Sequence, residues 1–331
     1  MRSSSIARAV SRGLSTNKGG APGAPNPHEY CSDVVKRGDY DGYLYSLLQG
    51  SEKRAAAFAI RAFNVETAAI KDSVRGNLMP GRMRFQWWKD SLADIFAGDP
   101  PPQPVTLALA DIIKKEPGVL TRRWFDRVLD ARMVDLEQAQ PETLAEMETY
   151  AENTASSLLY LSLEVAGIRA GSGPGTATMG HAAGHVGKAV GICTFLRALA
   201  QPSTARRQEV VDTCILPMDV MRKNTLRHTV LERGPQNPEE SQALSECVFD
   251  VASVAKGHMD AAAEALETAR TESGGKLPTG AFAALLPGVR AAWYLETLQK
   301  CNFEAFDESL RPRSPLWFQW RLAKAMMAER F

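Results

Sequence analysis

Residues 58–72 read FAIRAFNVETAAIKD, and their apolar side chains recur every three or four positions. This spacing places them on one face of an α-helix, which has about 3.6 residues per turn. The stretch therefore predicts a helix from about Glu52 to Ser73. Residues 81–96, GRMRFQWWKDSLADIF, continue the same spacing and predict another helix that begins near Pro80.

The same periodicity extends in both directions from this pair of helices. No run of alternating apolar and polar residues is long enough to indicate a β-sheet, so the chain is predicted to be all-α. Pro and Gly residues separate the segments, most clearly in GDPPPQP at 98–104 and at Pro117-Gly118. The remaining predicted helices cover residues 30–48, a segment ending near 115, 121–138, 141–168, 176–199, 239–272, 278–299 and a Trp-rich C-terminal segment.

The predicted helix over residues 176–199 is unusually rich in small side chains. Gly184, Gly187, Gly191 and the neighbouring alanines would let the backbones of adjacent helices approach closely. We therefore expect this helix to lie at the centre of a bundle. The glycine-rich segment 170–175 and the polar, basic segment 201–214 are predicted to be loops at its two ends.

Composition excludes several functional classes. The 39 basic and 38 acidic residues leave a formal net charge of +1, which offers no field for holding a nucleic-acid backbone. The 5 cysteines form no CxxC pair and are odd in number, so neither a zinc knuckle nor a disulfide framework is indicated. No apolar run approaches the roughly 18–20 residues that span a bilayer.

Residues 1–28 differ in composition from the rest of the chain. Arginines, serines and threonine are frequent there, and no acidic residue precedes Glu29. Ile6, Val10 and Leu14 recur every four residues and would form an apolar stripe on a helix, as in mitochondrial transit peptides. We predict a transit peptide and a Gly/Pro-rich linker over residues 1–28, followed by one domain over residues 29–331.

Several segments, in this order, resemble the squalene/phytoene synthase family. They are similar to its first Asp-rich helix, its Arg-hydrophobic-Gln-Trp-Trp signature, the Tyr-containing helix that lines the substrate cavity, and its second Asp-rich helix. The resemblance covers about residues 30–320 and implies an all-α, isoprenoid-synthase helical bundle. The segments are residues 58–64 with Glu66 and Asp72, residues 82–88 (RMRFQWW), residues 150–157 (YAENTASS), and residues 187–197 with Leu216-Pro217-Met218-Asp219.

The metal-binding acids of the family's enzymes are largely missing. Those enzymes hold magnesium ions between carboxylates and a diphosphate leaving group. By the resemblance, Ala68 and Ala69 stand at leading acidic positions of the first helix, where only Asp72 remains, and Ala198 stands at an acidic position of the second. Loss of one well-placed charge stabiliser commonly costs about 10²- to 10³-fold in rate. We therefore predict a pseudoenzyme with no catalytic residue, bound metal or cofactor.

The chain resembles one mitochondrial subfamily of this family more closely still. The segments RAFNVE at 61–66, QWWK at 86–89 and YAENTASSLLYL at 150–161 are similar to members that assist the assembly of respiratory complex I. This resemblance implies a non-catalytic role at an early stage of assembly, on the matrix side of the mitochondrial inner membrane. It implies as partners early complex I assembly intermediates and other assembly factors, with peripheral association with the membrane.

Other functions remain open at this point. One is a prenyl-diphosphate transferase with an atypical metal site, and another is a lipid- or isoprenoid-binding module without turnover. By the resemblance, the residues that line a vestigial substrate pocket are Asp72, Arg84, Tyr150, Asn153 and Arg197. The sequence equally allows that pocket to have collapsed into core.

Two further aspartate pairs at helical spacing, Asp90 with Asp94 and Asp126 with Asp130, lie outside the family's motif positions. The second pair lies among arginines at 122, 123, 127 and 132, so ion pairing on a solvated helix face is the expected explanation.

His181 and His185 also share a helix face, but the sequence shows no third ligand and no HExxH pattern, so a zinc site is not predicted. Trp87 and Trp88 are expected to be packing anchors. Basic residues within 203–233 suggest a membrane-facing patch.

Overall fold

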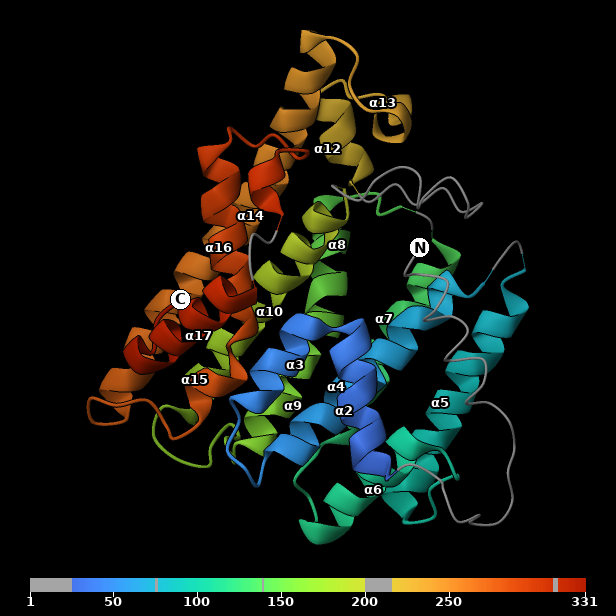
Figure 1. Cartoon of the computed structure of the whole chain (residues 1–331), viewed down its shortest axis with the longest axis vertical. Coiled ribbons are helices and arrows are strands. Elements are labelled where there is room, and N and C mark those ends of the chain that lie inside the picture. Colours follow the sequence, from blue (N-terminus) through green and yellow to red (C-terminus); the bar gives the residue numbers. More distant parts are fainter. Residues whose placement is uncertain (1–25, 75–76, 139, 200–215, 312–314) are drawn as a thin grey trace. The chain divides into compact units, whose positions relative to one another are not determined.

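The structure is a computed structural model that describes residues 26–74, 77–138, 140–199, 216–311 and 315–331. All regular elements among these residues are helical, which confirms the predicted all-α class (Figure 1). The chain divides into two compact units, unit 1 (Met1–Leu136 and Leu161–Gly167) and unit 2 (Glu137–Tyr160 and Ile168–Phe331). Residues 1–25 of the predicted transit segment and the predicted loop 201–214 lie outside the described residues.

Unit 1 is organised around the helix predicted from residues 58–72. This helix, α4, packs against α2, α3, α5 and α6. Its fully buried Phe63 meets the ring of Trp88 edge-on at 5.2 Å and that of Phe125 at 5.1 Å, so aromatic packing joins α4 to its neighbours. The helices of unit 1 are α2 (Pro27–Gly38), α3 (Tyr40–Leu47), α4 (Arg54–Asp72), α5 (Met79–Ala97), α6 (Pro104–Lys115) and α7 (Arg122–Glu137).

The predicted helix over residues 30–48 is interrupted at Asp39. The Asp39 carboxylate accepts a hydrogen bond from the backbone N–H of Gly42 at 2.8 Å and thereby caps the start of α3. The same carboxylate pairs with Arg61 of α4 at 2.9 Å. An aspartate that satisfies a free N–H group favours a helix start over a helix interior, which explains the break.

Unit 2 is organised around α10 (Thr176–Leu199), whose bounds match the prediction. It packs mainly against the long helix α14 and also against α8, the following π-helical turn and α16. The α9 helix contains residues of both units. The other elements are α8 (Leu144–Ala151), the π-helical turn (Glu152–Ser156), α9 (Ser157–Val165), α12 (Met218–Lys223), α13 (His228–Arg233), α14 (Pro238–Glu272), α15 (Ala281–Ala284), α16 (Pro287–Lys300), a 3₁₀ turn (Glu308–Leu310) and α17 (Pro315–Ala328).

The small residues of α10 allow the close packing that was predicted. A Cβ atom at Gly187 would collide with the backbone of Ser156, and a Cβ atom at Gly191 would collide with Ala151. Ser156 also donates a hydrogen bond from Oγ to the carbonyl oxygen of Gly184 at 2.9 Å. Glycine is therefore required on this face of α10 because another backbone occupies the space of a side chain.

The helices predicted over residues 141–168 and 278–299 are each interrupted. A π-helical turn separates α8 from α9 at the place where Ser156 contacts α10. In the second case α15 ends before Pro287, which stands in the first turn of α16. Proline suits that position because the first N–H groups of a helix have no intrahelical acceptor.

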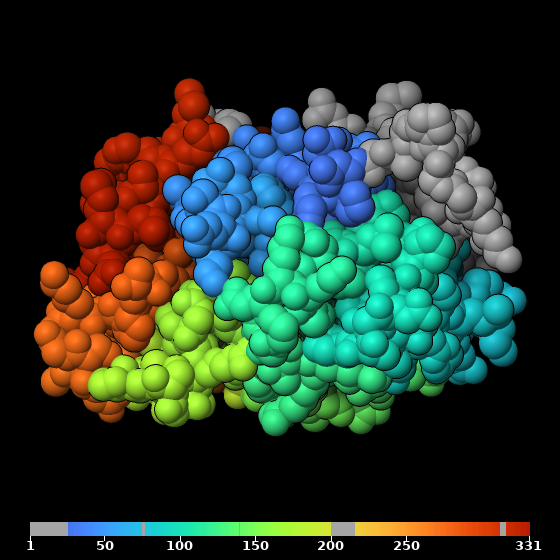
Figure 2. All heavy atoms as spheres, turned by 90° about the horizontal axis from the view of Figure 1, so that it is seen from below, coloured from blue at the N-terminus to red at the C-terminus, as the bar shows by residue number. Residues whose placement is uncertain are grey.

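The C-terminal helix α17 lies on the surface of unit 2, drawn in dark red in Figure 2. Its buried side chains Phe318, Leu322 and Ala325 follow helical spacing and pack toward the unit. No helix among the described residues is long and apolar enough to cross a membrane.

Candidate functional site

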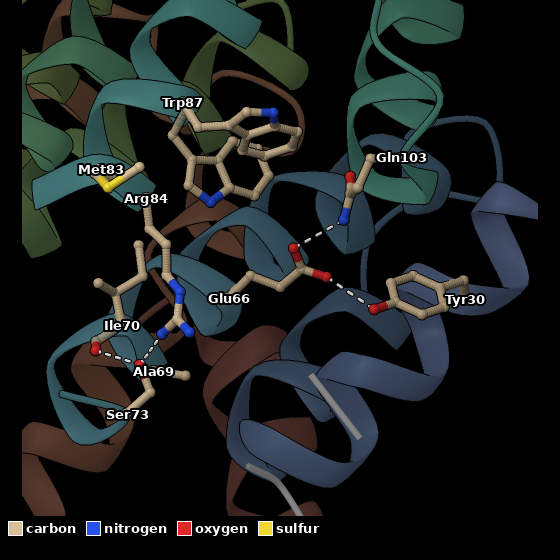
Figure 3. Close-up of a pocket in the computed structure, with 10 residues that line it drawn as sticks. Tyr30, Glu66, Ala69, Ile70, Ser73, Met83, Arg84, Trp87 and Gln103 are labelled. Atoms are coloured by element: carbon tan, nitrogen blue, oxygen red, sulfur yellow. Dashed lines mark hydrogen bonds between the residues drawn. The ribbon is translucent and has the colours of Figure 1, made fainter. Parts of the chain in front are cut away.

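A cavity of about 170 Å³ lies in unit 1 among α2, α4, α5 and the start of α6. The α4 residues that face it stand at helical spacing, so they share one side of that helix. Two neighbouring tryptophans of α5 form much of the opposite wall (Figure 3). The cavity is lined by Tyr30, Glu66, Ala69, Ile70, Ser73, Met83, Arg84, Trp87, Trp88 and Gln103.

Glu66 is the polar centre of this cavity. Its carboxylate accepts a hydrogen bond from Tyr30 Oη at 2.9 Å and another from Gln103 Nε2 at 2.8 Å (Figure 3). Burial raises the pKa of Glu66 to about 7, although both hydrogen bonds act in the opposite direction. The carboxyl group is therefore present in both protonation states near neutral pH. Burial likewise raises the pKa of the Tyr30 phenol.

Arg84 extends beside α4 at the other end of the cavity. Its guanidinium donates a hydrogen bond to Ser73 Oγ, and Ser73 Oγ donates to the carbonyl oxygen of Ile70 at 2.7 Å (Figure 3). The Trp87 and Trp88 rings meet at 5.1 Å. Trp88 is buried, as expected of a packing anchor, whereas Trp87 is half-buried against the cavity.

The positions on α4 that the resemblance assigns to lost metal-binding acids carry no metal ligand. Ala68 is exposed and Ala69 faces the cavity, and neither side chain has an atom that can bind a metal. Asp72 is exposed near the end of α4, while Glu66 is held by Tyr30 and Gln103. Among the described residues, no group of three or more His, Cys, Asp or Glu side chains could hold a metal ion. In the part of the chain that the structure describes, these positions therefore do not supply the set of carboxylates that holds magnesium in the family's enzymes.

The residues predicted to line the vestigial pocket fall in both units. Asp72 and Arg84 belong to unit 1, whereas Tyr150, Asn153 and Arg197 belong to unit 2. All except Asp72 are half-buried. That all five residues line one tunnel remains a prediction.

Within unit 2, the Tyr150 ring packs against the Phe195 ring at 5.5 Å, which joins the end of α8 to the last turns of α10. Ala198, which the resemblance assigns as the third position of a lost acid, lies half-buried in the last turn of α10.

The aspartate pairs of α5 and α7 have structural roles. Asp126 pairs with Arg122 at 3.2 Å on an exposed face, which confirms the expected explanation for this residue. Asp130 pairs instead with Lys89 of α5 at 2.5 Å, and Asp90 accepts a hydrogen bond from Gln86 at 2.9 Å.

The prediction that the arginines of α7 lie on a solvated face is wrong for Arg132. This side chain is buried and donates to the carbonyl oxygen of Asn64 at 3.0 Å, to Asn64 Oδ1 at 2.6 Å and to Thr67 Oγ1. The guanidinium thus ties α7 to the middle of α4. Helical spacing alone did not reveal this role because the acceptors belong to a distant part of the chain.

His185 of α10 belongs to a small hydrogen-bonded cluster, and the His181 ring packs edge-on against the His185 ring at 4.6 Å. His185 Nδ1 lies 2.8 Å from His258 Nδ1, and His258 Nε2 lies 2.7 Å from the carboxylate oxygen Glu148 Oε1. Burial lowers the pKa of His185, with the nearby histidines adding to the effect. His258 and Glu148 could not be predicted from the spacing of the two histidines of α10, because they lie on α14 and α8.

Tyr30 and Gln103 were also missed as partners of Glu66. Gln103 precedes Pro104 in a segment that the sequence indicated only as a break between helices. Its side-chain oxygen accepts a hydrogen bond from Thr106 N at 2.9 Å and so caps α6, and its side-chain nitrogen donates to Glu66. A polar residue directly before a helix-initiating proline was the available signal.

Comparison with known proteins places the chain in a class. Residues 35–321 match the model of the squalene/phytoene synthase family, and the chain therefore belongs to this family. Among solved structures it is similar to the squalene synthase HpnC from Alicyclobacillus acidocaldarius, with a TM-score of 0.66 and 14% identity over 84% of this chain and 95% of that one. It is also similar to a dehydrosqualene synthase in complex with ligand, with a TM-score of 0.64 and 18% identity over 92% and 96% of the two chains. At these identities the likeness shows the fold.

Relatives found by sequence similarity have names that state a role. The chain is 36% identical over 315 residues to "NADH dehydrogenase (ubiquinone) complex I, assembly factor 6" of Bos taurus, covering 95% of this chain and 86% of that protein. It is 36% identical to the Homo sapiens protein of the same name, covering 92% and 83%. The Drosophila melanogaster homologue of that factor is 33% identical, covering 87% and 80%. The subfamily resemblance inferred from the motifs is thus confirmed.

Proposed function

We propose that this chain serves the assembly of mitochondrial respiratory complex I by binding assembly intermediates, without catalysis. The observation that carries the proposal is the similarity, over most of its length, to relatives named complex I assembly factor 6. The chain is accordingly a complex I assembly factor. Its partners are early assembly intermediates and other assembly factors, on the matrix side of the inner membrane.

The chemistry of the former active site supports the non-catalytic part of the proposal. An enzyme of this family must neutralise the charge that develops on a diphosphate leaving group. Ala68, Ala69 and Ala198 provide no carboxylate for this purpose, and Asp72 alone remains. A prenyl-diphosphate transferase of the usual kind is therefore disfavoured.

The decisive experiment measures complex I in cells depleted of this protein. The wild-type chain and an Asp72→Ala, Arg197→Ala double variant, checked for native folding by circular dichroism, are each returned to the cells. We expect complex I abundance and activity to fall selectively on depletion and to recover with both forms. Unchanged complex I after depletion would contradict the assembly role, and rescue by the wild type alone would show that the former active site is still needed.

A further inference from the structure

The C-terminal helix α17 carries two apolar faces. Phe318 and Leu322 are buried and hold the helix against unit 2, where Trp317 also meets Trp293 at 5.5 Å. A second apolar stripe points in the opposite direction. It consists of Leu316, Trp320, Ala323 and Met327, which follow one another at helical spacing.

The outward stripe is strongly exposed. The relative exposure is 74% for Leu316, 62% for Trp320 and 82% for Met327. Leu316 and Met327 are the two most exposed large hydrophobic side chains among the described residues. An apolar stripe aligned along one helix is unlike isolated surface hydrophobics and indicates a surface that contacts something.

The charges beside the stripe are basic. Within α17, Pro315–Ala328, the charged residues are Arg321 and Lys324, and no acidic residue lies in the helix. Lys324 is exposed and lies 5.7 Å from the centre of the Trp320 ring. Arg321 lies on the flank toward unit 2, where it pairs with Glu296 at 2.8 Å and contacts the Trp317 ring at 5.8 Å. Basic side chains next to tryptophan and long apolar side chains are the composition of helices that lie in a membrane interface.

Other occupants fit this face less well. In a symmetric contact with a second copy, the basic flanks of the two α17 helices would face each other and repel. The stripe is the face of a helix, so a protein partner would have to provide the groove that receives it, and the rescue experiment below tests that outcome. A lipid surface with anionic head groups matches both the apolar stripe and its basic flank.

We propose that α17 is an interfacial helix that attaches this protein to an anionic lipid bilayer. Leu316, Trp320 and Met327 enter the boundary between head groups and acyl chains, and Lys324 binds lipid phosphates. Only the identification of this bilayer with the mitochondrial inner membrane rests on the proposed function. The attachment itself is a property of α17.

The test uses the full chain and two kinds of vesicle, phosphatidylcholine alone and phosphatidylcholine mixed with cardiolipin. We expect the chain to float with the cardiolipin vesicles and to bind the neutral vesicles more weakly. Trp320 emission should shift to the blue on binding, because the indole leaves water. Replacing Trp320 by Phe should remove that shift while binding is largely retained.

The critical variant is Leu316→Ser, Trp320→Ser, Met327→Ser, which changes only exposed side chains and leaves the buried face of α17 intact. We expect it to lose about tenfold or more in affinity for cardiolipin vesicles. Lys324→Ala should lose about fivefold, with the loss diminishing at high salt. The matched control is Met79→Ser, Val134→Ser, which removes comparably exposed apolar side chains elsewhere and should bind as the wild type does.

The outcomes separate the membrane surface from the assembly role. No vesicle binding by the wild type, or equal binding by the triple variant, would overturn the proposal. If the wild type binds no vesicles but the triple variant fails to restore complex I in depleted cells, the face belongs to a protein partner instead, and the assembly role stands. Vesicle binding that depends on α17 would stand even if depletion left complex I unchanged.

Discussion

The carboxylate of Glu66, on α4, accepts hydrogen bonds from Tyr30 of α2 and from Gln103 at the start of α6. Burial in this setting raises its pKa to about 7. Since the raised pKa belongs to the folded state, the ionisation of Glu66 is linked to the stability of the protein.

The sign of this linkage gives a prediction. At pH values between the ordinary pKa of 4.5 and the raised pKa of about 7, folding is accompanied by the binding of a proton to Glu66. The contribution of Glu66 to the free energy of unfolding therefore falls as the pH rises through this range. Glu66→Gln removes the titration. The difference in free energy of unfolding, variant minus wild type, should therefore be larger at about pH 8 than at about pH 5, by at most about 3 kcal/mol. Urea unfolding at the two pH values measures the change.

The control for this experiment is Glu264→Gln, which neutralises an exposed carboxylate on α14. Its difference from the wild type should be nearly the same at both pH values. If Glu66→Gln follows the wild-type pH dependence as closely as this control does, the pKa of Glu66 is not raised and the interpretation fails.

Arg132 gives a second prediction at the residue scale. Arg132→Met keeps the length of the side chain but removes the charged donors from the carbonyl and side-chain oxygens of Asn64 and from Thr67. We expect the free energy of unfolding to fall by about 2–4 kcal/mol, because buried acceptors lose their partners. Arg122→Met, on the exposed face of the same helix, should cost no more than about 0.5 kcal/mol. Equal losses in the two variants would argue against the buried role.

At the scale of elements, α10 provides a matched pair of glycines. A Cβ atom at Gly187 would collide with the Ser156 backbone, whereas one at Gly180 would meet nothing within 4 Å. Gly187→Ala should destabilise the protein by about 2–3 kcal/mol or more, because the backbone on the other side must move. Gly180→Ala should stabilise it by about 0.5–1 kcal/mol, through helix propensity.

Denaturation midpoints of the two variants and the wild type measure this difference. Both substitutions are the same chemical change in the same helix, so opposite signs isolate the effect of packing. Stabilisation by both would mean that α10 and the π-helical turn are farther apart than the structure shows.

The elements also show which local signals are informative. The bounds predicted for α10 are those that it has in the structure, because a glycine-rich segment at 170–175 and a polar, basic segment at 201–214 flank an uninterrupted stretch rich in alanine and glycine. The spacing of apolar residues missed the break at Asp39, because a side-chain cap acts on one N–H group and leaves the apolar pattern unchanged. The π-helical turn was missed for a similar reason.

At the scale of the whole molecule, the missing acids predict an absence of turnover. The full chain, incubated with farnesyl or geranylgeranyl diphosphate and Mg²⁺, should release no diphosphate above the rate in buffer. A bacterial dehydrosqualene synthase assayed in parallel provides the positive control. Magnesium-dependent release that is lost in Asp72→Ala would show that an atypical metal site still works and would contradict the pseudoenzyme assignment.

The all-α class, the family and the relation to complex I assembly factors could be predicted from the amino-acid sequence, as could the lack of a carboxylate at Ala68, Ala69 and Ala198. These features are carried by local periodicity and by residue identity at motif positions, which a linear sequence records directly. Three features became visible only in the folded chain: the hydrogen bonds of Glu66 with Tyr30 and Gln103, the burial of Arg132 against α4, and the division of the apolar side chains of α17 between a buried and an exposed face. Hydrogen-bond partners and burial depend on which distant segments fold together, and these contacts leave no pattern in the spacing of residues along the chain.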